Sequence, residues 1–233
     1  MTAPTPPRPT ARAVPSASSA SSSPTAHGRF ALAPPVTPQL LAQAHASPGR
    51  QIYVVDPEFD PAGEVPGWGI RGFFPVSENG TLLEREWVPN PYYRPGPLTL
   101  EFPQPRTWLE RALQLAAAGH QPDRHLLAVL VASEVVIPTA AEYPDQVPVT
   151  GDRQGRDILT VFTRADLLPA GVPHRQVPVA VLAPLLPTVT VVINPGLRPA
   201  AELPGADVAA ALAATSATSV SSASATAPAD REK

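Results

Sequence analysis

Apolar residues in the second half of the chain recur at two different periods, which predicts alternating helices and strands. From Thr107 the sequence has the form of a capping box, followed by apolar residues at intervals of three and four, and this pattern predicts a helix that ends at Gly119. A second helix is expected over residues 122–132. Residues 158–162 and 189–193 are rich in β-branched side chains and should form strands. The second of these runs is apolar on both faces, as is typical of a covered central strand.

The remaining apolar stretches predict shorter elements. Proline directly after a hydroxyl side chain favours the start of a helix, and a β-branched run closed by proline favours a strand. The expected elements are a helix after Thr37, strands over residues 52–55, 135–138 and 176–177, a short helix capped by Thr163, and another over residues 179–186.

Asn79-Gly80 is a preferred two-residue turn and predicts a β-hairpin. With that turn, paired residue numbers across the hairpin sum to 159. The more apolar face then holds Ile70, Gly72, Phe74 and Val76 on the first strand with Leu83 and Trp87 on the second. A three-residue loop with a bulge is the alternative.

Interleaved helices and strands predict an α+β fold, a single domain in which a mixed β-sheet packs with short helices. Residues 1–35 are rich in proline and serine, and residues 205–233 are mainly alanine, serine and threonine. Neither end has enough apolar surface to offset the entropy of ordering it, so both are expected to be disordered tails. The folded domain should span residues 36–204. Residues 208–214 are expected to form at most a turn or two of transient helix.

Charge and composition narrow the classes of function. The expected domain carries 12 Arg against 17 Asp and Glu, a net charge of −5, which argues against nucleic-acid binding. The chain has no cysteine, which excludes disulfides and thiol catalysis. No apolar run approaches the ~18 residues of a membrane span, and the N-terminus lacks the apolar stretch of a signal peptide. We therefore expect a cytoplasmic protein without membrane insertion.

Three groups of ionisable residues are the candidates for a catalytic or metal site. The acidic residues after the first expected strand lack the spacing of a calcium loop; they are Asp56, Glu58, Asp60 and Glu64. The histidines His120 and His125 lack a third metal ligand. The glutamates Glu84 and Glu86 alternate on the polar face of the hairpin. Each is expected to be a solvated surface group. With no phosphate-binding loop or hydrolase motif, the sequence predicts neither an enzyme nor a bound metal or cofactor.

Four short stretches occur in a characteristic order along the expected domain. They are Ile52-Tyr53-Val54-Val55-Asp56-Pro57, Trp68-Gly69-Ile70 leading to Glu78-Asn79-Gly80, Asn90-Pro91-Tyr92-Tyr93-Arg94-Pro95, and Leu159-Thr160-Val161-Phe162-Thr163 with Val191-Val192-Ile193-Asn194-Pro195-Gly196. In this order the chain resembles the type VII secretion system-associated proteins of actinobacteria, whose domain is related to the SseB N-terminal family. The resemblance implies an SseB-like domain and an accessory role near a secretion apparatus. It implies no reaction.

The best candidate for a binding surface is the aromatic segment formed by Trp87, Tyr92, Tyr93 and Arg94. Aromatic residues and arginine commonly anchor protein interfaces. The alternative is that the two tyrosines only seal the hairpin against the helices.

The sequence therefore predicts an accessory or adaptor protein that binds protein components or substrates of a type VII secretion system. One alternative is a secreted substrate of that system. None of the three tryptophans has a glycine two residues on, and none of the four tyrosines has an acidic residue four residues on, so the expected export signals are missing. The other alternative is a cryptic enzyme, which a deep pocket with convergent ionisable groups would favour.

Overall fold

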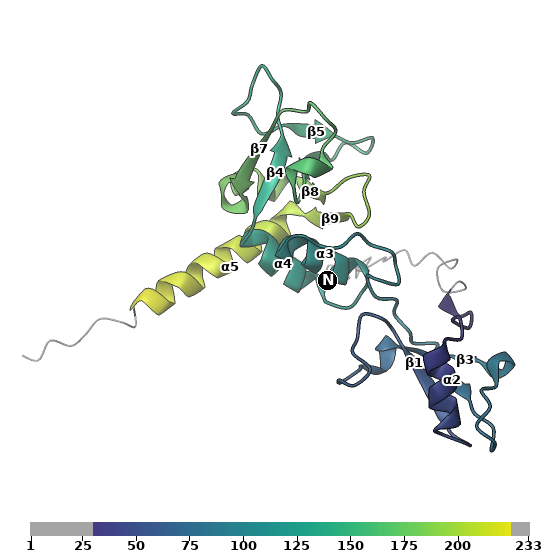
Figure 1. The fold of residues 1–233 in the computed structure, drawn as a ribbon. Coiled ribbons are helices and arrows are strands. Elements are labelled where there is room, and N and C mark those ends of the chain that lie inside the picture. Colours follow the sequence, from purple (N-terminus) through teal and green to yellow (C-terminus); the bar gives the residue numbers. More distant parts are fainter. Residues whose placement is uncertain (1–29, 225–233) are drawn as a thin grey trace, which may run out of the picture.

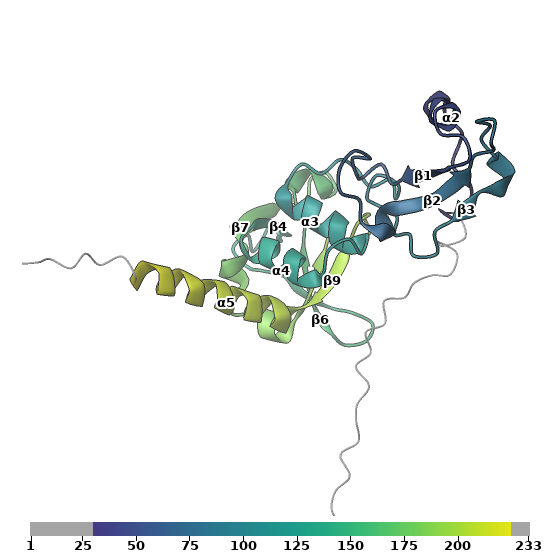
Figure 2. The ribbon, with the colours of Figure 1, turned by 90° about the horizontal axis from the view of Figure 1, so that it is seen from below.

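The computed structural model describes residues 30–224 and confirms the predicted α+β class. Helices and strands alternate along this part of the chain, and the strands form three sheets. Figures 1 and 2 show the elements gathered in two lobes, a smaller N-terminal lobe and a larger C-terminal lobe that begins at α3. Each lobe has its own hydrophobic cluster.

The N-terminal lobe is a helix packed on a three-stranded antiparallel sheet with strand order β1-β2-β3. Thr37 caps the helix as predicted, with its hydroxyl accepting from the Leu40 N–H at 3.3 Å. The elements, where η is a 3-10 helix, are α2 (Pro38–His45), β1 (Gln51–Val55), η1 (Gly67–Gly69), β2 (Ile70–Pro75), η2 (Glu84–Glu86) and β3 (Val88–Pro89).

The C-terminal lobe holds a four-stranded mixed sheet, a two-stranded sheet and the three longer helices. The helices and 3-10 turns are α3 (Trp108–Ala117), α4 (Asp123–Val131), η3 (Ala165–Leu167), η4 (Val179–Leu182), η5 (Leu186–Thr188) and α5 (Gly205–Ser224). The strands are β4 (Glu134–Pro138), β5 (Val149–Gly151), β6 (Asp157–Val161), β7 (His174–Pro178), β8 (Thr190–Ile193) and β9 (Ala201–Pro204). The single helix expected over residues 179–186 is replaced by two 3-10 turns, η4 and η5.

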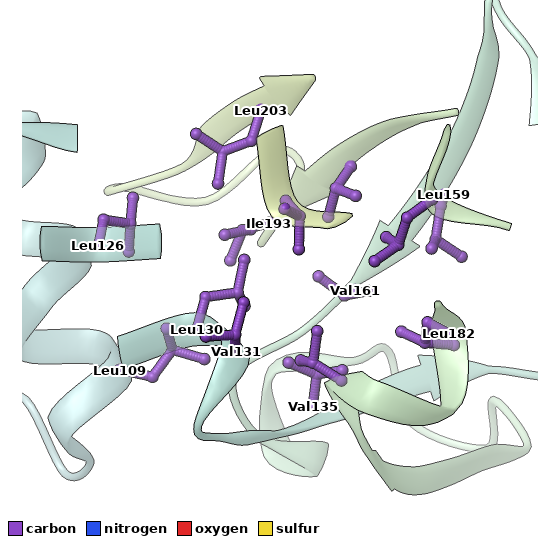
Figure 3. Packing of buried hydrophobic residues seen from close by; sticks show 14 of the residues in the cluster. Leu109, Leu126, Leu130, Val131, Val135, Leu159, Val161, Leu182, Ile193 and Leu203 are labelled. Carbon is purple, nitrogen blue, oxygen red and sulfur yellow. The ribbon is translucent and has the colours of Figure 1, made fainter. Parts of the chain in front are cut away.

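Strand β8 is central, as its sequence predicts. It pairs in parallel with β6 on one side and antiparallel with β9 on the other, and β5 completes the sheet beside β6. Figure 3 shows side chains of α3, α4 and these strands converging on one core. Leu130, Val135, Leu159 and Ile193 are almost completely buried there. This core fixes the carboxyl ends of β6 and β8 next to each other.

The expected disordered tail over residues 205–233 is wrong at its start. Helix α5 begins at Gly205, its first turns pack on α4 and η5, and Val208 is fully buried. A Cβ on Gly205 would lie 2.5 Å from the Val189 carbonyl oxygen and closer still to that of Leu186, so only glycine fits where the helix leaves the sheet. Alanine propensity alone predicts only a transient helix here, whereas the buried Val208 anchors the helix to the lobe. Residues 225–233 lie outside the described residues.

The hairpin adopts the alternative three-residue loop, which shifts the register. Ser77 and Thr81 face each other across the turn, Gly80 takes a positive φ of 82°, and Val76 pairs with Leu82. Because a slip of one residue exchanges the two faces of a strand, Leu82 is buried and Leu83 is only half-buried, the reverse of the predicted pattern. The 3-10 turn η2 then interrupts the second strand before β3.

The segment just before α2 also departs from the expected tail over residues 1–35. The Ala31 carbonyl oxygen accepts a hydrogen bond from Trp87 Nε1 at 3.0 Å, Phe30 packs edge-on against Tyr93, and Pro34 is buried. The physical reason is that Phe30 and Ala31 meet aromatic side chains from a distant part of the chain. Residues 1–29 lie outside the described part.

Within residues 30–224, no helix is both long enough and apolar enough to cross a membrane.

Candidate functional site

The loop that carries the predicted binding residues is held in place by Asn90. Its side-chain amide donates to the carbonyl oxygens of Gly67 and Ile70 at 2.8 and 2.7 Å, and its Oδ1 accepts from the Tyr92 N–H at 3.0 Å. One side chain therefore ties the loop to the start of β2 and shapes its turn. This fixation limits the entropy that the loop would lose on binding a partner.

Two of the four predicted residues, Tyr92 and Arg94, lie on the surface. The Tyr92 side chain is 79% exposed. Arg94 is exposed but anchored: its Nη1 donates to the Gly119 carbonyl oxygen at 3.0 Å, and its guanidinium lies 6.0 Å from the centre of the Trp68 ring. These two side chains are available to a partner in the folded protein.

Tyr93, by contrast, is buried. Its hydroxyl donates to the carboxylate of Asp56 and also contacts Thr99. Burial and the hydrogen bond to Asp56 raise the pKa of the Tyr93 phenol well above its usual range. For this residue the structural alternative holds, because the side chain seals the loop against the body of the protein.

Trp87 is half-buried rather than exposed. Its ring packs on Phe74 with centroids 4.6 Å apart and lies against the backbone of Gly72, as the hairpin prediction expected. Its indole N–H donates a hydrogen bond to the Ala31 carbonyl oxygen. The structure thus places Trp87 and Tyr93 in structural contacts and leaves Tyr92 and Arg94 as the exposed members of the predicted site.

The acidic residues after β1 were expected to be solvated, and for Asp56 and Glu58 this is wrong. Asp56 is fully buried and accepts from the N–H groups of Glu58 and Gly96 at 2.9 and 3.0 Å, from the Thr99 hydroxyl at 2.8 Å, and from Tyr93. Such a carboxylate is stabilised by the donors that surround it. Gly96 must lack a side chain, because a Cβ there would lie 2.5 Å from Asp56 Oδ1.

Glu58 joins the two lobes through an ion pair with Arg111 of α3. Its side chain is only 9% exposed. Asp60 remains at the surface and caps a turn by accepting from the Ala62 N–H at 2.9 Å. Both roles are structural.

His120 packs against two aromatic rings of the N-terminal lobe. Its ring centre lies 4.4 Å from that of Trp68 and 5.8 Å from that of Phe59, and its Nε2 lies 3.0 Å from the Arg94 carbonyl oxygen. His125 is exposed on α4. Among residues 30–224, no group of three or more potential ligands that could hold a metal ion is found.

Glu84 and Glu86 are exposed, as expected for a solvated face. They lie on the 3-10 turn η2, however, and not on a strand as the hairpin prediction assumed.

The structure also reveals a cavity of about 610 Å³ that the sequence did not indicate. It opens where β6 and β8 end and where α3 begins, so three segments distant in sequence meet at its wall. Its lining combines apolar and polar side chains: Pro103, Gln104, Pro105, Arg106, Glu110, Leu113, Gln114, Arg164, Leu167, Asn194, Leu197, Arg198 and Pro199.

Glu110 and Asn194, which line this cavity, belong to a buried polar network. Glu110, at the start of α3, accepts from the Arg106 N–H at 2.6 Å, from the Thr163 hydroxyl at 3.2 Å and from Arg164 at 3.0 Å. Asn194, with a positive φ of 53°, accepts from the Thr163 N–H at 2.9 Å and donates to its hydroxyl at 3.1 Å. Thr163 therefore links β6, β8 and α3 and does not cap η3 as predicted.

Arginine side chains supply the positive charge of the cavity. Arg164 also binds Asp166 at 2.8 Å, and Arg106 binds Asp166 at 3.2 Å. The hydrogen bond to Arg164 lowers the pKa of Asp166, and the same bond raises the pKa of Arg164, so both groups stay charged. Arg198 is exposed and forms no ion pair with any residue of the described chain.

Most of the cavity lining belongs to the part of the chain that matches a known family. Residues 109–210 match the SseB protein N-terminal domain. The SseB-like match starts within α3 and runs through β9 into α5, so it coincides with the C-terminal lobe. The N-terminal lobe and its loop with Tyr92 lie outside the match. Among curated proteins and among solved structures, no match is found.

The cavity was missed because its residues are ordinary when taken one at a time. Arg106, Arg164 and Arg198 lie far apart in the sequence, and nothing in their spacing brings them together. One signal was available: the run Asn194-Pro195-Gly196 after an apolar strand, since ligands often bind at the carboxyl ends of parallel strands.

Proposed function

We propose that this protein is a non-enzymatic accessory protein of a type VII secretion system, and that it acts in the cytoplasm by binding another protein. The proposed partner is a component of the secretion apparatus or one of its substrates. The family resemblance of the sequence supports the secretion assignment. The match of residues 109–210 supports its SseB-like part alone.

The observation that carries the binding role is the exposed Tyr92 on a loop fixed by Asn90. The Tyr92 side chain is 79% exposed, and exposing an aromatic ring to water is unfavourable. Such a side chain is a typical anchor of an interface. Arg94, two residues on, is held by Gly119 and Trp68 and is also exposed. The pair thus presents an aromatic and a cationic group in a fixed relation.

The outer face of the neighbouring sheet supports the same role. Tyr53, Phe73 and Val88 are direct neighbours across β1, β2 and β3. Tyr53 and Val88 are 56% and 42% exposed, and the Tyr53 and Phe73 rings lie 5.7 Å apart. This row gives the N-terminal lobe an apolar surface beyond the loop.

The experiment compares two exposed tyrosines. Purified wild type, Tyr92→Ala and Tyr143→Ala are titrated with the secretion ATPase and with small helical substrates encoded near its gene. Tyr143 is 56% exposed in the C-terminal lobe and serves as the matched control. We expect Tyr92→Ala to weaken binding by about tenfold or more and Tyr143→Ala to leave it unchanged.

The two other candidates predict different results. A secreted substrate would appear in the culture medium in a manner that depends on the secretion ATPase, whereas an accessory protein would stay with the cells. If Tyr92→Ala still binds as tightly as the wild type, the interface lies outside the loop. Absence of binding by the wild type to every component would overturn the proposal.

A further inference from the structure

We propose that the cavity at the carboxyl ends of β6 and β8 binds a ligand that carries one carboxylate next to an apolar group. This site lies in the C-terminal lobe and is independent of the loop with Tyr92. Its volume of about 610 Å³ lies within the ~300–1,000 Å³ that is usual for pockets that bind small ligands or the end of a peptide.

The charges that face the cavity leave one positive charge uncompensated. Three arginines, Arg106, Arg164 and Arg198, line it. Two carboxylates neutralise two of them: Glu110, which also lines the cavity, is bound by Arg164, and Asp166, which does not line it, is bound by both Arg164 and Arg106. Arg198 is left as the cation without a carboxylate in the described chain. A ligand with a single negative charge would complete the balance, whereas a doubly charged phosphate would exceed it.

The shape of the guanidinium group favours a carboxylate as that charge. Arginine presents paired N–H donors that match the two oxygens of a carboxylate. Arg198 follows the turn after β8, and its side chain is exposed, so its donors are accessible from the mouth of the cavity. Arg164 is less suited to this role, because each of its three nitrogens already donates to Glu110 or Asp166.

The rest of the lining favours an apolar body on the ligand. Leu113, Leu167 and Leu197 contribute to the wall, together with prolines from the loop before α3. Gln114 adds a hydrogen-bonding group: its amide nitrogen donates to the Pro103 carbonyl oxygen at 2.6 Å, and its side-chain oxygen has no bonding partner within the described chain. An amide N–H next to the carboxylate, as in an acylated amino acid or a peptide end, would satisfy that oxygen.

The test uses N-acetyl-leucine as the probe and its uncharged amide as the matched ligand. Binding is followed by NMR through the side-chain amide signals of Gln114 and Asn194. We expect N-acetyl-leucine to shift both signals in a saturable manner and N-acetyl-leucinamide to bind about tenfold or more weakly. Inorganic phosphate, tested in the same way, should bind more weakly than N-acetyl-leucine.

Two variants and a control locate the site. Arg198→Ala should lower the affinity for N-acetyl-leucine about tenfold, because it removes the uncompensated cation. Leu197→Ala should lower it severalfold by removing part of the apolar wall. Arg153→Ala, which removes an exposed arginine on the turn between β5 and β6, should have no effect. Both Arg198 and Leu197 have exposed side chains, so the variants should melt like the wild type.

Equal binding of the acid and its amide, tighter binding of phosphate, or an equal loss in Arg153→Ala would overturn the proposal, as would the absence of any shift. A third ligand distinguishes the two sources of such a carboxylate. If a hexapeptide ending in leucine binds more tightly than N-acetyl-leucine, and its C-terminal amide does not, the site takes peptide ends. If both acids bind equally, it takes a free small acid. Either result supports the carboxylate site.

Discussion

Among single residues, Asp56 helps Asn90 to fix the loop that carries Tyr92. Its buried carboxylate collects donors from both ends of that loop, namely the Tyr93 hydroxyl and the Gly96 N–H, as well as the Thr99 hydroxyl. The sequence indicates a turn at Asp56-Pro57 but cannot show that residues some forty positions away complete it. Short-range patterns predict the turn, and only the tertiary fold supplies its partners.

The hydroxyl of Tyr93 can be tested by removing it. Tyr93→Phe keeps the buried ring but leaves Asp56 with one donor fewer, so it should lower the free energy of unfolding by about 2 kcal/mol at neutral pH. Urea denaturation measures this. An unchanged stability would show that the hydroxyl contributes nothing to holding the loop.

The same residue predicts a dependence on alkaline pH. The folded protein raises the pKa of Tyr93, so the folded state holds its proton more tightly than the unfolded state does. The stabilisation is therefore complete below the ordinary tyrosine pKa of 10.0 and is lost as the pH rises above it. The gap in stability between wild type and Tyr93→Phe should narrow above about pH 10. A gap that widens there would contradict the assigned direction.

Among the secondary-structure elements, the hairpin can be tested because its two possible registers bury different leucines. The two-residue turn would bury Leu83, whereas the observed three-residue loop buries Leu82, which is 6% exposed. We expect Leu82→Ala to cost about 2–5 kcal/mol and Leu83→Ala distinctly less. Chemical denaturation of the two variants measures the difference. A larger loss for Leu83→Ala than for Leu82→Ala would indicate the register of the two-residue turn instead.

Helix α5 gives a second test at this scale. Val208 is completely buried against the C-terminal lobe, whereas Val181 in the same lobe is 55% exposed. Val208→Ala should lower the free energy of unfolding by about 2 kcal/mol, and the identical change at Val181 should cost well under 1 kcal/mol. Equal effects would mean that the helix does not pack on the lobe.

These elements show what local patterns can and cannot determine. The helices after Thr37 and Thr107 were predicted because capping and apolar spacing act within a few residues. The parallel pairing of β6 with β8, and hence the cavity between α3 and Asn194, depends on contacts between distant segments. The same holds for α5, whose anchoring depends on one buried side chain.

At the scale of the whole molecule, the contacts between the lobes decide how the loop with Tyr92 sits beside the SseB-like part. The ion pair of Glu58 with Arg111 and the bond from Arg94 to Gly119 cross this boundary, and the His120 ring lies against Trp68 and Phe59. Polar and aromatic contacts therefore join two separate hydrophobic clusters.

Breaking the ion pair tests how tightly the lobes are joined. Arg111→Ala leaves the largely buried Glu58 without its partner, so we expect a loss of about 1–3 kcal/mol. The control is Arg156→Ala, which breaks exposed pairs with Asp152 at 2.7 Å and with Glu202 at 3.6 Å and should cost clearly less than Arg111→Ala. Equal losses, measured by urea denaturation, would show that the pair between the lobes is no stronger than a surface pair.

Site-specific photocrosslinking can show whether the protein binds a secretion partner through the exposed loop, as we propose. A photoreactive benzoyl-phenylalanine is placed at Tyr92 in one variant and at Tyr143 in another, and both are irradiated in the native cell. We expect position 92 to crosslink to a component or substrate of the type VII secretion system and position 143 not to do so. Crosslinks to no such protein from position 92, or the same crosslinks from both positions, would contradict it.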